Sequence, residues 1–281
     1  MTVVESTSEA RCLAASLARP LVLVPTMGAL HVGHLALIEF ARTHAGNEGK
    51  VAVSVFVNPI QFDRSSDLEC YPRTFESDLE ACERAGVDLV FAPGSQGMYA
   101  PDQSVIVHES RLSRYLCGAT RPGHFDGVCT VVLKLFNLLG PDAAVFGEKD
   151  FQQLAIIRRM VRDLNVSVEI LAHPTVREPD GLALSSRNAR LSPEHRSDAP
   201  RIFRSLQAAA GLMRYGERQA EPILAAARAH LEESPFLRID YLELVDADSL
   251  QPISIIRAPA VLATAVYYGE VRLIDHITLK P

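Results

Sequence analysis

Apolar residues in the first two thirds of the chain fall into short runs separated by turn residues. Four almost continuously apolar runs predict strands covered on both faces, at residues 21–24, 50–57, 87–93 and 143–146. Helical apolar spacing separates them, at residues 33–44, 74–86 and 130–139. Strands that alternate with helices at this spacing predict an α/β fold with a doubly wound parallel sheet.

Three weaker patterns complete this part of the chain. Residues 166–171 alternate between apolar and polar positions and predict a further strand. Residues 104–108 predict a short strand, and residues 111–116 predict a helical turn.

The pattern changes from about residue 176. Two alanine-rich helical segments, at 200–215 and 218–232, precede three strand-like runs at 238–245, 260–268 and 271–279. Helices followed by sequential strands predict a small α+β domain. We therefore expect a larger domain over residues 1–175 and a smaller α+β domain over residues 176–281.

The composition is that of a soluble globular protein. The 281 residues are 48% hydrophobic and 22% charged, which suits one large domain or two modest ones. A formal net charge of −6 gives no basic excess, so we expect no nucleic-acid partner. No run approaches the roughly 18 apolar residues of a membrane span, and we expect no membrane contact. The five scattered cysteines form no CxxC pair, which argues against a disulfide framework or a zinc site and for a cytoplasmic protein.

Candidate chemistry begins in the sequence LVPTMGALHVGHLALIEF, residues 23–40. A strand, a glycine-containing turn and a helix aim backbone N–H groups and the positive end of a helix dipole at a phosphate. His31 and His34 are three residues apart, so both rings can lean toward one point, and Gly33 leaves room for a ligand. The structural alternative is that both histidines are turn and cap residues. The strand before the motif and the helix after it favour the functional interpretation.

Polar residues follow the strand at 50–57. Asn58, Pro59 and Gln61 fall just past its carboxyl end, where open α/β sheets bind ligands, although Asn58-Pro59 also fits a plain turn. The sequence RPGHFDGV at residues 121–128 fits either a loop that folds over a substrate or a connecting loop.

A second strand-to-helix turn carries Gly147, Glu148 and Lys149, and Asp150 begins the next helix. A cation at a helix N-terminus is electrostatically unfavourable unless an anion accompanies it, which suggests a phosphate partner. The alternative is a solvated Lys149 beside a capping box formed by Asp150 and Gln153.

A long connection without apolar periodicity covers residues 174–196. Long ordered loops in compact domains are often functional. Within it, Ser185, Ser186, Arg187 and Asn188 gather hydrogen-bond donors suited to phosphate oxygens.

These motifs carry a resemblance. TMGALHVGH resembles the HxGH signature of the nucleotidyltransferase superfamily, which class I aminoacyl-tRNA synthetases share. Six blocks resemble the pantoate–β-alanine ligase (pantothenate synthetase) family in the family's order over residues 24–188: VPTMGALHVGH, SVFVNPIQF, YPRT, RPGHFDGV, VFGEKDFQQ, and PTVRE with DGLALSSRN. The C-terminal third agrees in length and type only.

The resemblance implies a Rossmann-like fold and a two-step reaction. The carboxylate of (R)-pantoate attacks the α-phosphorus of ATP to give pantoyl adenylate and pyrophosphate. The amine of β-alanine then attacks the activated carbonyl, giving pantothenate and AMP. The family also implies Mg²⁺ with ATP and a homodimer. No carboxylate cluster identifies a metal ligand, and Asp78 is only a weak candidate.

The resemblance also implies roles for particular residues. His34 is expected to stabilise the departing pyrophosphate, with proton transfer as a further part of its role, and His31 lies beside it. Lys149 and Arg187 are expected to neutralise the β- and γ-phosphates, and Gln61 and Gln153 to hold pantoate. The implied ATP-binding residues are Met27, Gly28, Ala29, Leu30, His31, Val32, Gly33, His34, Gly147, Glu148, Lys149, Asp150, Val176, Leu184, Ser185, Ser186 and Arg187. The family often has methionine where this chain has Leu184, and the two side chains are similar in size.

Two other functions stay open at this point. One is a nucleotidyltransferase with another substrate, or a class I synthetase fragment. The SSRN sequence in place of a lysine-rich KMSKS sequence and the acidic charge balance argue against it. The other is a catalytically silent nucleotide-binding protein on the same fold, which a fold alone never excludes.

Overall fold

A computed structural model describes all residues, 1–281. The chain divides into two compact units. The N-terminal unit comprises Met1–Glu109, Arg121–Glu148 and Gln153–Pro174. The C-terminal unit comprises Ser110–Thr120, Lys149–Gln152 and Thr175–Pro281. Two short segments that we expected in the first domain therefore belong to the C-terminal unit.

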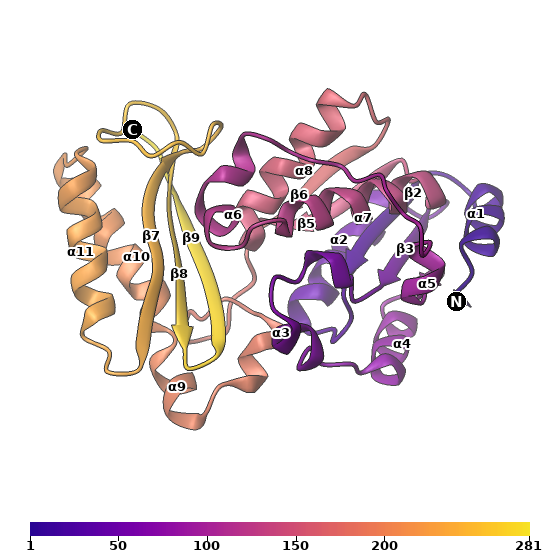
Figure 1. The fold of residues 1–281 in the computed structure, drawn as a ribbon, viewed down its shortest axis with the longest axis horizontal. Helices are drawn as coiled ribbons and strands as arrows, with labels where there is room; N and C mark the ends of the chain where they lie inside the picture. Colours follow the sequence, from indigo (N-terminus) through magenta and orange to yellow (C-terminus); the bar gives the residue numbers. More distant parts are fainter. The chain divides into compact units, whose positions relative to one another are not determined.

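A six-stranded parallel sheet forms the centre of the N-terminal unit (Figure 1). The strand order is β1-β4-β3-β2-β5-β6, which confirms the predicted doubly wound, Rossmann-like sheet. The strands are β1 (Thr2–Val4), β2 (Leu21–Thr26), β3 (Lys50–Val55), β4 (Leu89–Phe91), β5 (Ala143–Gly147) and β6 (Glu169–His173).

Helices connect these strands. They are α1 (Thr7–Ser16), α2 (Val32–Ala45), the 3₁₀ turn η1 (Pro59–Gln61), α3 (Ser65–Glu69), α4 (Phe75–Arg84), α5 (Ser95–Met98), α7 (His124–Leu139), η3 (Glu148–Asp150) and α8 (Phe151–Asp163).

Both faces of the parallel sheet are buried, as the continuous apolar runs predict. Val22 and Val24 pack with Ile38 of α2 on one face. Leu21 and Leu23 point to the opposite face because side chains alternate along a strand, and they too are fully buried.

Two local predictions need correction, one is confirmed, and two elements were not predicted. Residues 104–108 form an extended segment without a partner strand, and Val105 and Ile106 there are 78% and 57% exposed. The helical turn predicted at residues 111–116 is confirmed as the 3₁₀ turn η2 (Leu112–Arg114), and α6 (Leu116–Thr120) begins at its end. Helix α7 begins six residues before the predicted 130, at His124. Strand β1 and helix α1 were not predicted, because the strand is very short and the helix buries only Ala10 and Ala14.

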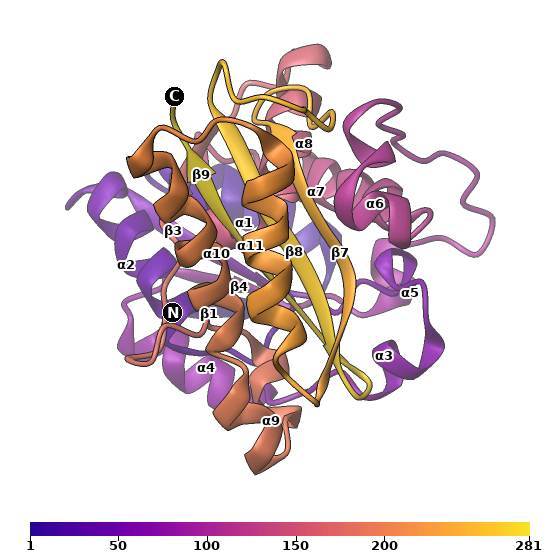
Figure 2. The same ribbon diagram turned by 90° about the vertical axis from the view of Figure 1, so that its left-hand side faces the viewer.

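The C-terminal unit has an antiparallel sheet in the order β7-β8-β9. Its strands are β7 (Leu237–Asp246), β8 (Ala260–Tyr268) and β9 (Val271–Leu279), close to the predicted runs. Its other helical elements are η4 (Ser186–Arg190), α9 (Pro193–Asp198), α10 (Arg201–Gly211), η5 (Leu212–Tyr215) and α11 (Ala220–Glu232). Figure 2 shows α10 and α11 side by side across this sheet.

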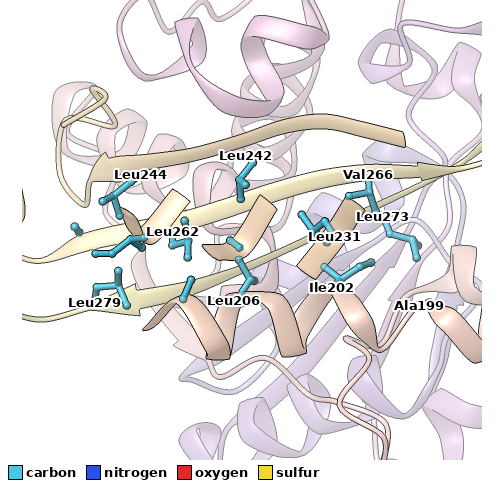
Figure 3. Packing of buried hydrophobic residues seen from close by; sticks show 14 of the residues in the cluster. Ala199, Ile202, Leu206, Leu231, Leu242, Leu244, Leu262, Val266, Leu273 and Leu279 are labelled. Atoms are coloured by element: carbon cyan, nitrogen blue, oxygen red, sulfur yellow. The ribbon is translucent and has the colours of Figure 1, made fainter. Parts of the chain in front are cut away.

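The core of the C-terminal unit lies between these helices and the sheet (Figure 3). Ile202 and Leu206 of α10 meet Leu262 of β8 and Leu273 of β9 in one buried cluster. Both faces of β8 are buried along its whole length.

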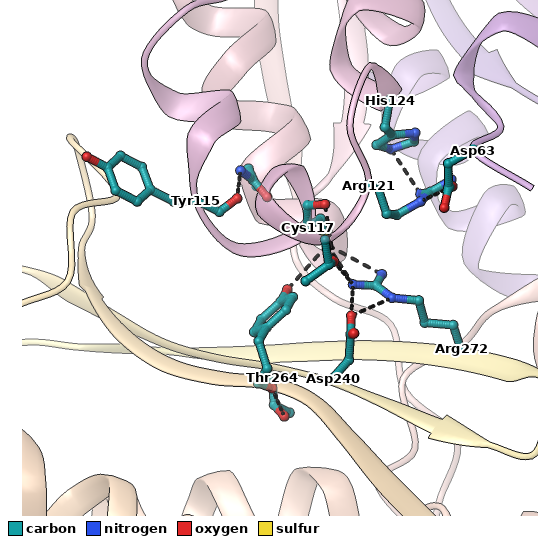
Figure 4. A network of polar contacts seen from close by, with 11 residues as sticks. Asp63, Tyr115, Cys117, Arg121, His124, Asp240, Thr264 and Arg272 are labelled. Atoms are coloured by element: carbon teal, nitrogen blue, oxygen red, sulfur yellow. Dashed lines mark hydrogen bonds and ion pairs between the residues drawn. The ribbon is translucent and has the colours of Figure 1, made fainter.

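Polar contacts tie the segment 110–120 to the C-terminal sheet (Figure 4). Arg272 of β9 donates to Asp240 at 2.7 Å, to Thr120 Oγ1 at 3.1 Å and to Cys117 Sγ at 3.6 Å. The Cys117 thiol and the Tyr241 hydroxyl are 3.3 Å apart. Burial, with the neighbouring Cys117 adding to it, raises the pKa of Tyr241 well above its usual value. The hydroxyl therefore stays neutral and hydrogen-bonded at physiological pH.

No helix in the structure is both long and apolar enough to cross a membrane.

Leu206 tests the contribution of the C-terminal core. Its side chain is fully buried, so we expect Leu206→Ala to lower the free energy of unfolding by about 3 kcal/mol through lost burial and a residual cavity. Urea denaturation followed by circular dichroism measures this change. Leu164→Ala is the matched control, because Leu164 is 51% exposed and should change the free energy by at most about 0.5 kcal/mol. Equal, small effects at the two positions would contradict the described packing.

Candidate active site

The parallel sheet has a switch point between β2 and β5. Strands β3 and β4 lie on one side of β2, and β6 lies beyond β5. Because β2 and β5 are parallel, with Val22 beside Ala143, their carboxyl ends meet at one edge of the sheet. Open α/β sheets bind ligands at such an edge. The turn after β2 carries His31, and the turn after β5 starts at Gly147.

The two histidines cap helix α2 reciprocally. His31 is the N-cap, and its Nδ1 accepts a hydrogen bond from Gly33 N at 3.1 Å. His34 Nδ1 accepts one from His31 N at 3.2 Å. The ring centroids are 4.0 Å apart. The structural alternative, that these histidines are cap residues, is therefore confirmed.

Capping also determines which nitrogen of each ring carries the proton. A nitrogen that accepts a hydrogen bond from a backbone N–H bears a lone pair, so Nδ1 of both His31 and His34 is unprotonated. The neutral ring then carries its proton on Nε2. Each histidine thus caps through one nitrogen and is a hydrogen-bond donor through the other. The structural and functional interpretations are compatible.

The backbone N–H groups of this turn are largely used within the protein, contrary to our expectation of donors aimed at a phosphate. Gly28 N donates to Thr26 Oγ1 at 3.2 Å. Ala29 N and Leu30 N donate to the Asp78 carboxylate at 2.9 and 2.8 Å. The prediction of free N–H donors is wrong at these positions, because the Thr26 hydroxyl and the Asp78 carboxylate already accept these hydrogen bonds.

The Gln61 side chain has a fixed amide orientation. Asn58 Nδ2 donates to Gln61 Oε1 at 3.0 Å, and the Tyr99 hydroxyl donates to Asn58 Oδ1 at 2.6 Å. Gln61 Nε2 donates to Met27 Sδ at 3.0 Å, which is a weak acceptor. The hydrogen bond from Asn58 fixes which way the amide faces, and the second N–H of Gln61 Nε2 can donate to a ligand. The turn interpretation of Asn58-Pro59 is incomplete, because Asn58 is also buried and orients Gln61.

The backbone carbonyl of Gln61 is held separately, by residues of the RPGHFDGV sequence. His124 Nδ1 lies 2.7 Å from Gln61 O and must donate to it, and Arg121 Nη2 donates to the same oxygen at 3.3 Å. Arg121 Nε also donates to Asp63 at 2.7 Å (Figure 4). This segment thus holds the Gln61 backbone in place, and its last part is the first turn of α7 rather than a loop.

Gly127 allows helix α7 to approach the 3₁₀ turn η1 closely. A Cβ atom at position 127 would lie 2.5 Å from the carbonyl oxygen of Ile60 and 2.7 Å from Gln61 N. Both neighbours are backbone atoms, so neither moves easily. Only glycine fits between α7 and η1.

The turn after β5 crosses from one unit to the other. Gly147 and Glu148 belong to the N-terminal unit, and Lys149 and Asp150 to the C-terminal unit. Lys149 Nζ lies 3.7 Å from Asp150 Oδ1, so a protein anion offsets part of the cost of a cation just before helix α8. Gln153 follows on α8 and is half-buried.

The predicted adenine contact, Val176, lies in an irregular hairpin. Leu184 N donates to Val176 O at 3.0 Å, and Gly181 at the tip has a φ of +98°. Arg177 holds the hairpin to β9 through two hydrogen bonds to Asp275, at 2.6 and 2.9 Å. Its guanidinium also stacks 3.6 Å above the Phe203 ring. The long connection is therefore ordered despite its lack of periodicity.

The SSRN sequence forms the 3₁₀ turn that follows this hairpin. Ser185 Oγ accepts from Arg187 N at 3.2 Å and caps the turn. Asn188 Nδ2 donates to Ala183 O at 3.1 Å, which ties the turn back to the hairpin. Ser186 and Arg187 are half-buried. Leu184, Ser185, Ser186 and Arg187 are thus carried by one braced element of the C-terminal unit.

No group of three or more His, Cys, Asp or Glu side chains is arranged to hold a metal ion. Asp78, the weak magnesium candidate, is 2% exposed and accepts hydrogen bonds from two backbone N–H groups and from Thr74 Oγ1 at 3.2 Å. Its oxygens are committed to the protein, so it does not fit a magnesium ligand. All five cysteines are free thiols.

Sequence analysis missed several residues that build the site. Tyr99, Arg121 and His124 orient Gln61, and Arg177 braces the hairpin. The mixed sequence SQGMYAPDQ around Tyr99 gives no signal of its role. Arg177 and Asp275 are 98 positions apart, so no local pattern connects them.

Comparison with known proteins gives a consistent result. A family model described as pantoate–β-alanine ligase matches residues 2–278. A pantothenate synthetase of Akkermansia muciniphila is 57% identical over 258 residues, which is 92% of each chain. One of Thermotoga petrophila is 50% identical over 256 residues, 91% of this chain and 90% of the relative.

Solved structures agree with these relatives. Pantothenate synthetase from Thermus thermophilus has a TM-score of 0.93 and 46% identity, with each chain fully covered. Pantoate–β-alanine ligase from Francisella tularensis, complexed with β,γ ATP and β-alanine, has a TM-score of 0.80 and 30% identity, with 99% and 97% of the chains covered.

Asp63 tests the bracing of Gln61 through its pH dependence. Burial alone would raise the pKa of this carboxyl, but the hydrogen bond and charge of Arg121 outweigh burial and leave the pKa lowered. A carboxyl with a lowered pKa stabilises the fold above its unfolded pKa of about 3.9 and loses this effect as pH falls through the lowered value. We expect Asp63→Asn to lower the free energy of unfolding by about 1.5 kcal/mol at pH 7.

Denaturation of wild type and variant at several pH values measures this effect. The difference should shrink as pH falls below about 4. Asp163→Asn is the matched control, since Asp163 pairs with Arg162 at 2.7 Å but both side chains are more than half exposed. It should have almost no effect at any pH. A pH-independent difference for Asp63→Asn would refute the ion-pair explanation.

Proposed function

The chain belongs to the pantoate–β-alanine ligase family, and from that premise we propose that it condenses (R)-pantoate with β-alanine, using ATP and passing through pantoyl adenylate. The observation that supports this most directly is the pair of capped histidines at the carboxyl end of β2. Their Nε2–H groups supply neutral donors at an edge where α/β sheets bind ligands. The match to the family model over residues 2–278 supports the proposed identity of the substrates.

In the first step, a pantoate carboxylate oxygen forms a bond to the α-phosphorus of ATP, and the bond from that phosphorus to pyrophosphate breaks. Negative charge grows on the departing bridging oxygen. We assign His34 Nε2–H to donate a hydrogen bond to this oxygen, with His31 beside it. A preorganised donor aimed at developing charge stabilises the transition state more than the ground state.

In the second step, the β-alanine amine attacks the pantoyl carbonyl carbon, the carbon–oxygen bond to AMP breaks, and the amine loses a proton. A free carboxylate is a poor electrophile for this attack. Adenylation supplies the leaving group. The Francisella relative was crystallised with β,γ ATP and β-alanine together, which supports a site for both ligands.

The remaining assignments follow the elements of the site. Lys149 and Arg187 supply positive charge for the β- and γ-phosphates. Met27 to His34, Gly147 to Asp150, and Leu184 to Arg187 line the ATP site, and Val176 contacts adenine. The ordered hairpin supports the assignment of Val176, and the capped 3₁₀ turn supports that of Leu184 to Arg187, because each element presents a fixed backbone to a ligand.

Gln61 and Gln153 are proposed to hold pantoate. The hydrogen bond from Asn58 fixes the amide orientation of Gln61, and one of its two N–H groups remains for the ligand. Gln61 therefore donates to a hydroxyl or carboxylate oxygen of pantoate.

Magnesium is proposed to enter with ATP, where it would neutralise part of the charge of the phosphates. The protein offers no carboxylate cage, so the nucleotide is expected to supply most of the ligands.

We also propose a cytoplasmic homodimer. Five free thiols suit a reducing compartment. The exposed pair Val105 and Ile106, on an extended segment without a partner strand, is an apolar surface that a second copy is proposed to cover.

Isotope exchange tests the proposed function. Labelled pyrophosphate should enter ATP only when pantoate is present, and AMP should accumulate with pantothenate only when β-alanine is added. Exchange that depends on another acid would contradict the proposed substrate. ATP binding without AMP formation would indicate a silent nucleotide-binding protein.

His34 tests the charge-stabilising role. We expect His34→Ala to lower kcat by roughly two to three orders of magnitude, the usual effect of one lost donor of this kind. His44→Ala, at the other end of α2, is the matched control and should keep wild-type turnover. If the His34 variant keeps the wild-type rate, the role of this residue is capping alone.

Gln61 tests the donor assignment. We expect Gln61→Ala to raise KM for pantoate more than KM for ATP. Gln61→Glu keeps an acceptor for Asn58 but removes the donor and adds a negative charge, so it should raise KM for pantoate at least as much. Steady-state kinetics in both substrates measure this. Equal weakening of both substrates would count against the assignment.

A further inference from the structure

Asp78 is a buried carboxylate whose contacts lie mainly with the turn that carries the histidines. It lies in the first turn of α4 and is 2% exposed. Its hydrogen-bond donors, which are Ala29 N, Leu30 N and Thr74 Oγ1, are all uncharged. Burying a carboxylate without a cation is unfavourable unless hydrogen bonds compensate. The two backbone N–H groups from the turn provide most of that compensation.

The turn needs an external partner because its backbone is unusual. Gly28 has a φ of +76° and Ala29 a φ of +50°. Left-handed backbone is rare for a residue with a side chain, and it persists only where the surroundings impose it. At Ala29 and Leu30, successive N–H groups converge on one anion, as in the nests that bind phosphate. Here the anion is the Asp78 carboxylate.

The fit between the turn and the carboxylate is close on both sides. A Cβ atom at position 28 would lie 2.9 Å from Asp78 Oδ2 and 3.1 Å from Val55 Cγ1. Gly28 therefore combines a left-handed backbone with the space that Asp78 occupies. Neither requirement is met by another residue without a shift of the turn.

The position of the histidines depends on this contact. Leu30, whose N–H is bound by Asp78, is followed directly by His31. His31 N then donates to His34 Nδ1. A shift of the backbone at 29–30 would move the N-cap and with it both rings.

We propose that Asp78 is a positioning residue, whose carboxylate fixes the Ala29–Leu30 backbone so that the Nε2–H groups of His31 and His34 meet the departing pyrophosphate. This proposal rests on the proposed function for its catalytic consequence. It assigns Asp78 no contact with substrate or metal. Its effect is confined to adenylate formation, because pyrophosphate departs only in that step.

Two variants disturb the same contact from opposite sides. Asp78→Asn keeps the size of the side chain but replaces one acceptor oxygen with an NH₂ group that faces a backbone N–H. Gly28→Ala leaves the carboxylate in place and pushes the turn away from it. In both, we expect the rate of pantoate-dependent pyrophosphate release to fall about 100-fold, the scale of a misplacement of about 1 Å. In Asp78→Asn, whose side chain is assigned no substrate contact, the rate at which β-alanine consumes supplied pantoyl adenylate should stay within about threefold of wild type.

Asp88→Asn is the matched control. Asp88 accepts a hydrogen bond from Val51 N at 2.9 Å and pairs with Arg42 and Lys50, at the amino ends of the strands. This variant should lose thermal stability, as Asp78→Asn does, but keep both rates. Equal slowing of the two steps in Asp78→Asn, or no slowing of pyrophosphate release in either variant, would overturn the proposal.

Amide hydrogen exchange separates this proposal from the proposed function. The Ala29 and Leu30 amides should be protected in the wild type and should exchange at least tenfold faster in Asp78→Asn. This result does not depend on which substrates the enzyme uses. Unchanged protection would refute the contact itself, whereas absence of pantoate-dependent exchange in the wild type would refute only the assigned reaction.

Discussion

The turn between β2 and α2 is the constraint on which the candidate site depends. Two consecutive left-handed residues, Gly28 and Ala29, place the N-cap of α2 at the edge where β2 ends. Such a backbone is unfavourable by itself, and the buried Asp78 carboxylate offsets the cost by accepting the next two N–H groups. The parallel sheet supplies the edge, and the carboxylate fixes the turn upon it. The ring positions of His31 and His34 follow from both.

The side chains of His31 and His34 both cap helix α2 and serve the proposed chemistry. A serine or aspartate cap would satisfy the N–H groups of α2 equally well, but neither offers a neutral donor on its far side. Imidazole does both, because Nδ1 accepts from the backbone while Nε2 keeps the proton. Protonation of Nδ1 would break the cap, so the helix N-terminus favours the neutral rings. The two histidines cap the N-terminus of helix α2, and this capping selects the tautomer that the proposed chemistry needs.

Local sequence patterns predicted the elements whose structure depends mainly on residues close by in the sequence. Continuous apolar runs gave the central strands because a strand buried on both faces has no polar side. Val105 and Ile106 look equally strand-like, but no neighbouring strand pairs with them, and the sequence alone does not reveal that absence. The resemblance implies a set of binding residues, but it implies no role for the residues that hold their segments in place. Asp78 and Arg177 depend on contacts made only in the folded chain, 48 and 98 positions away.

We propose that two turns, one carrying paired histidines and one carrying a lysine, bind a single triphosphate. A crystal structure of the protein with a non-hydrolysable ATP analogue and pantoate tests it most directly. We predict that His34 Nε2 and Lys149 Nζ both lie within about 3 Å of oxygens of the same triphosphate, with the pantoate carboxylate facing its α-phosphorus. A triphosphate bound by only one of the two turns, or bound away from both, would contradict the account.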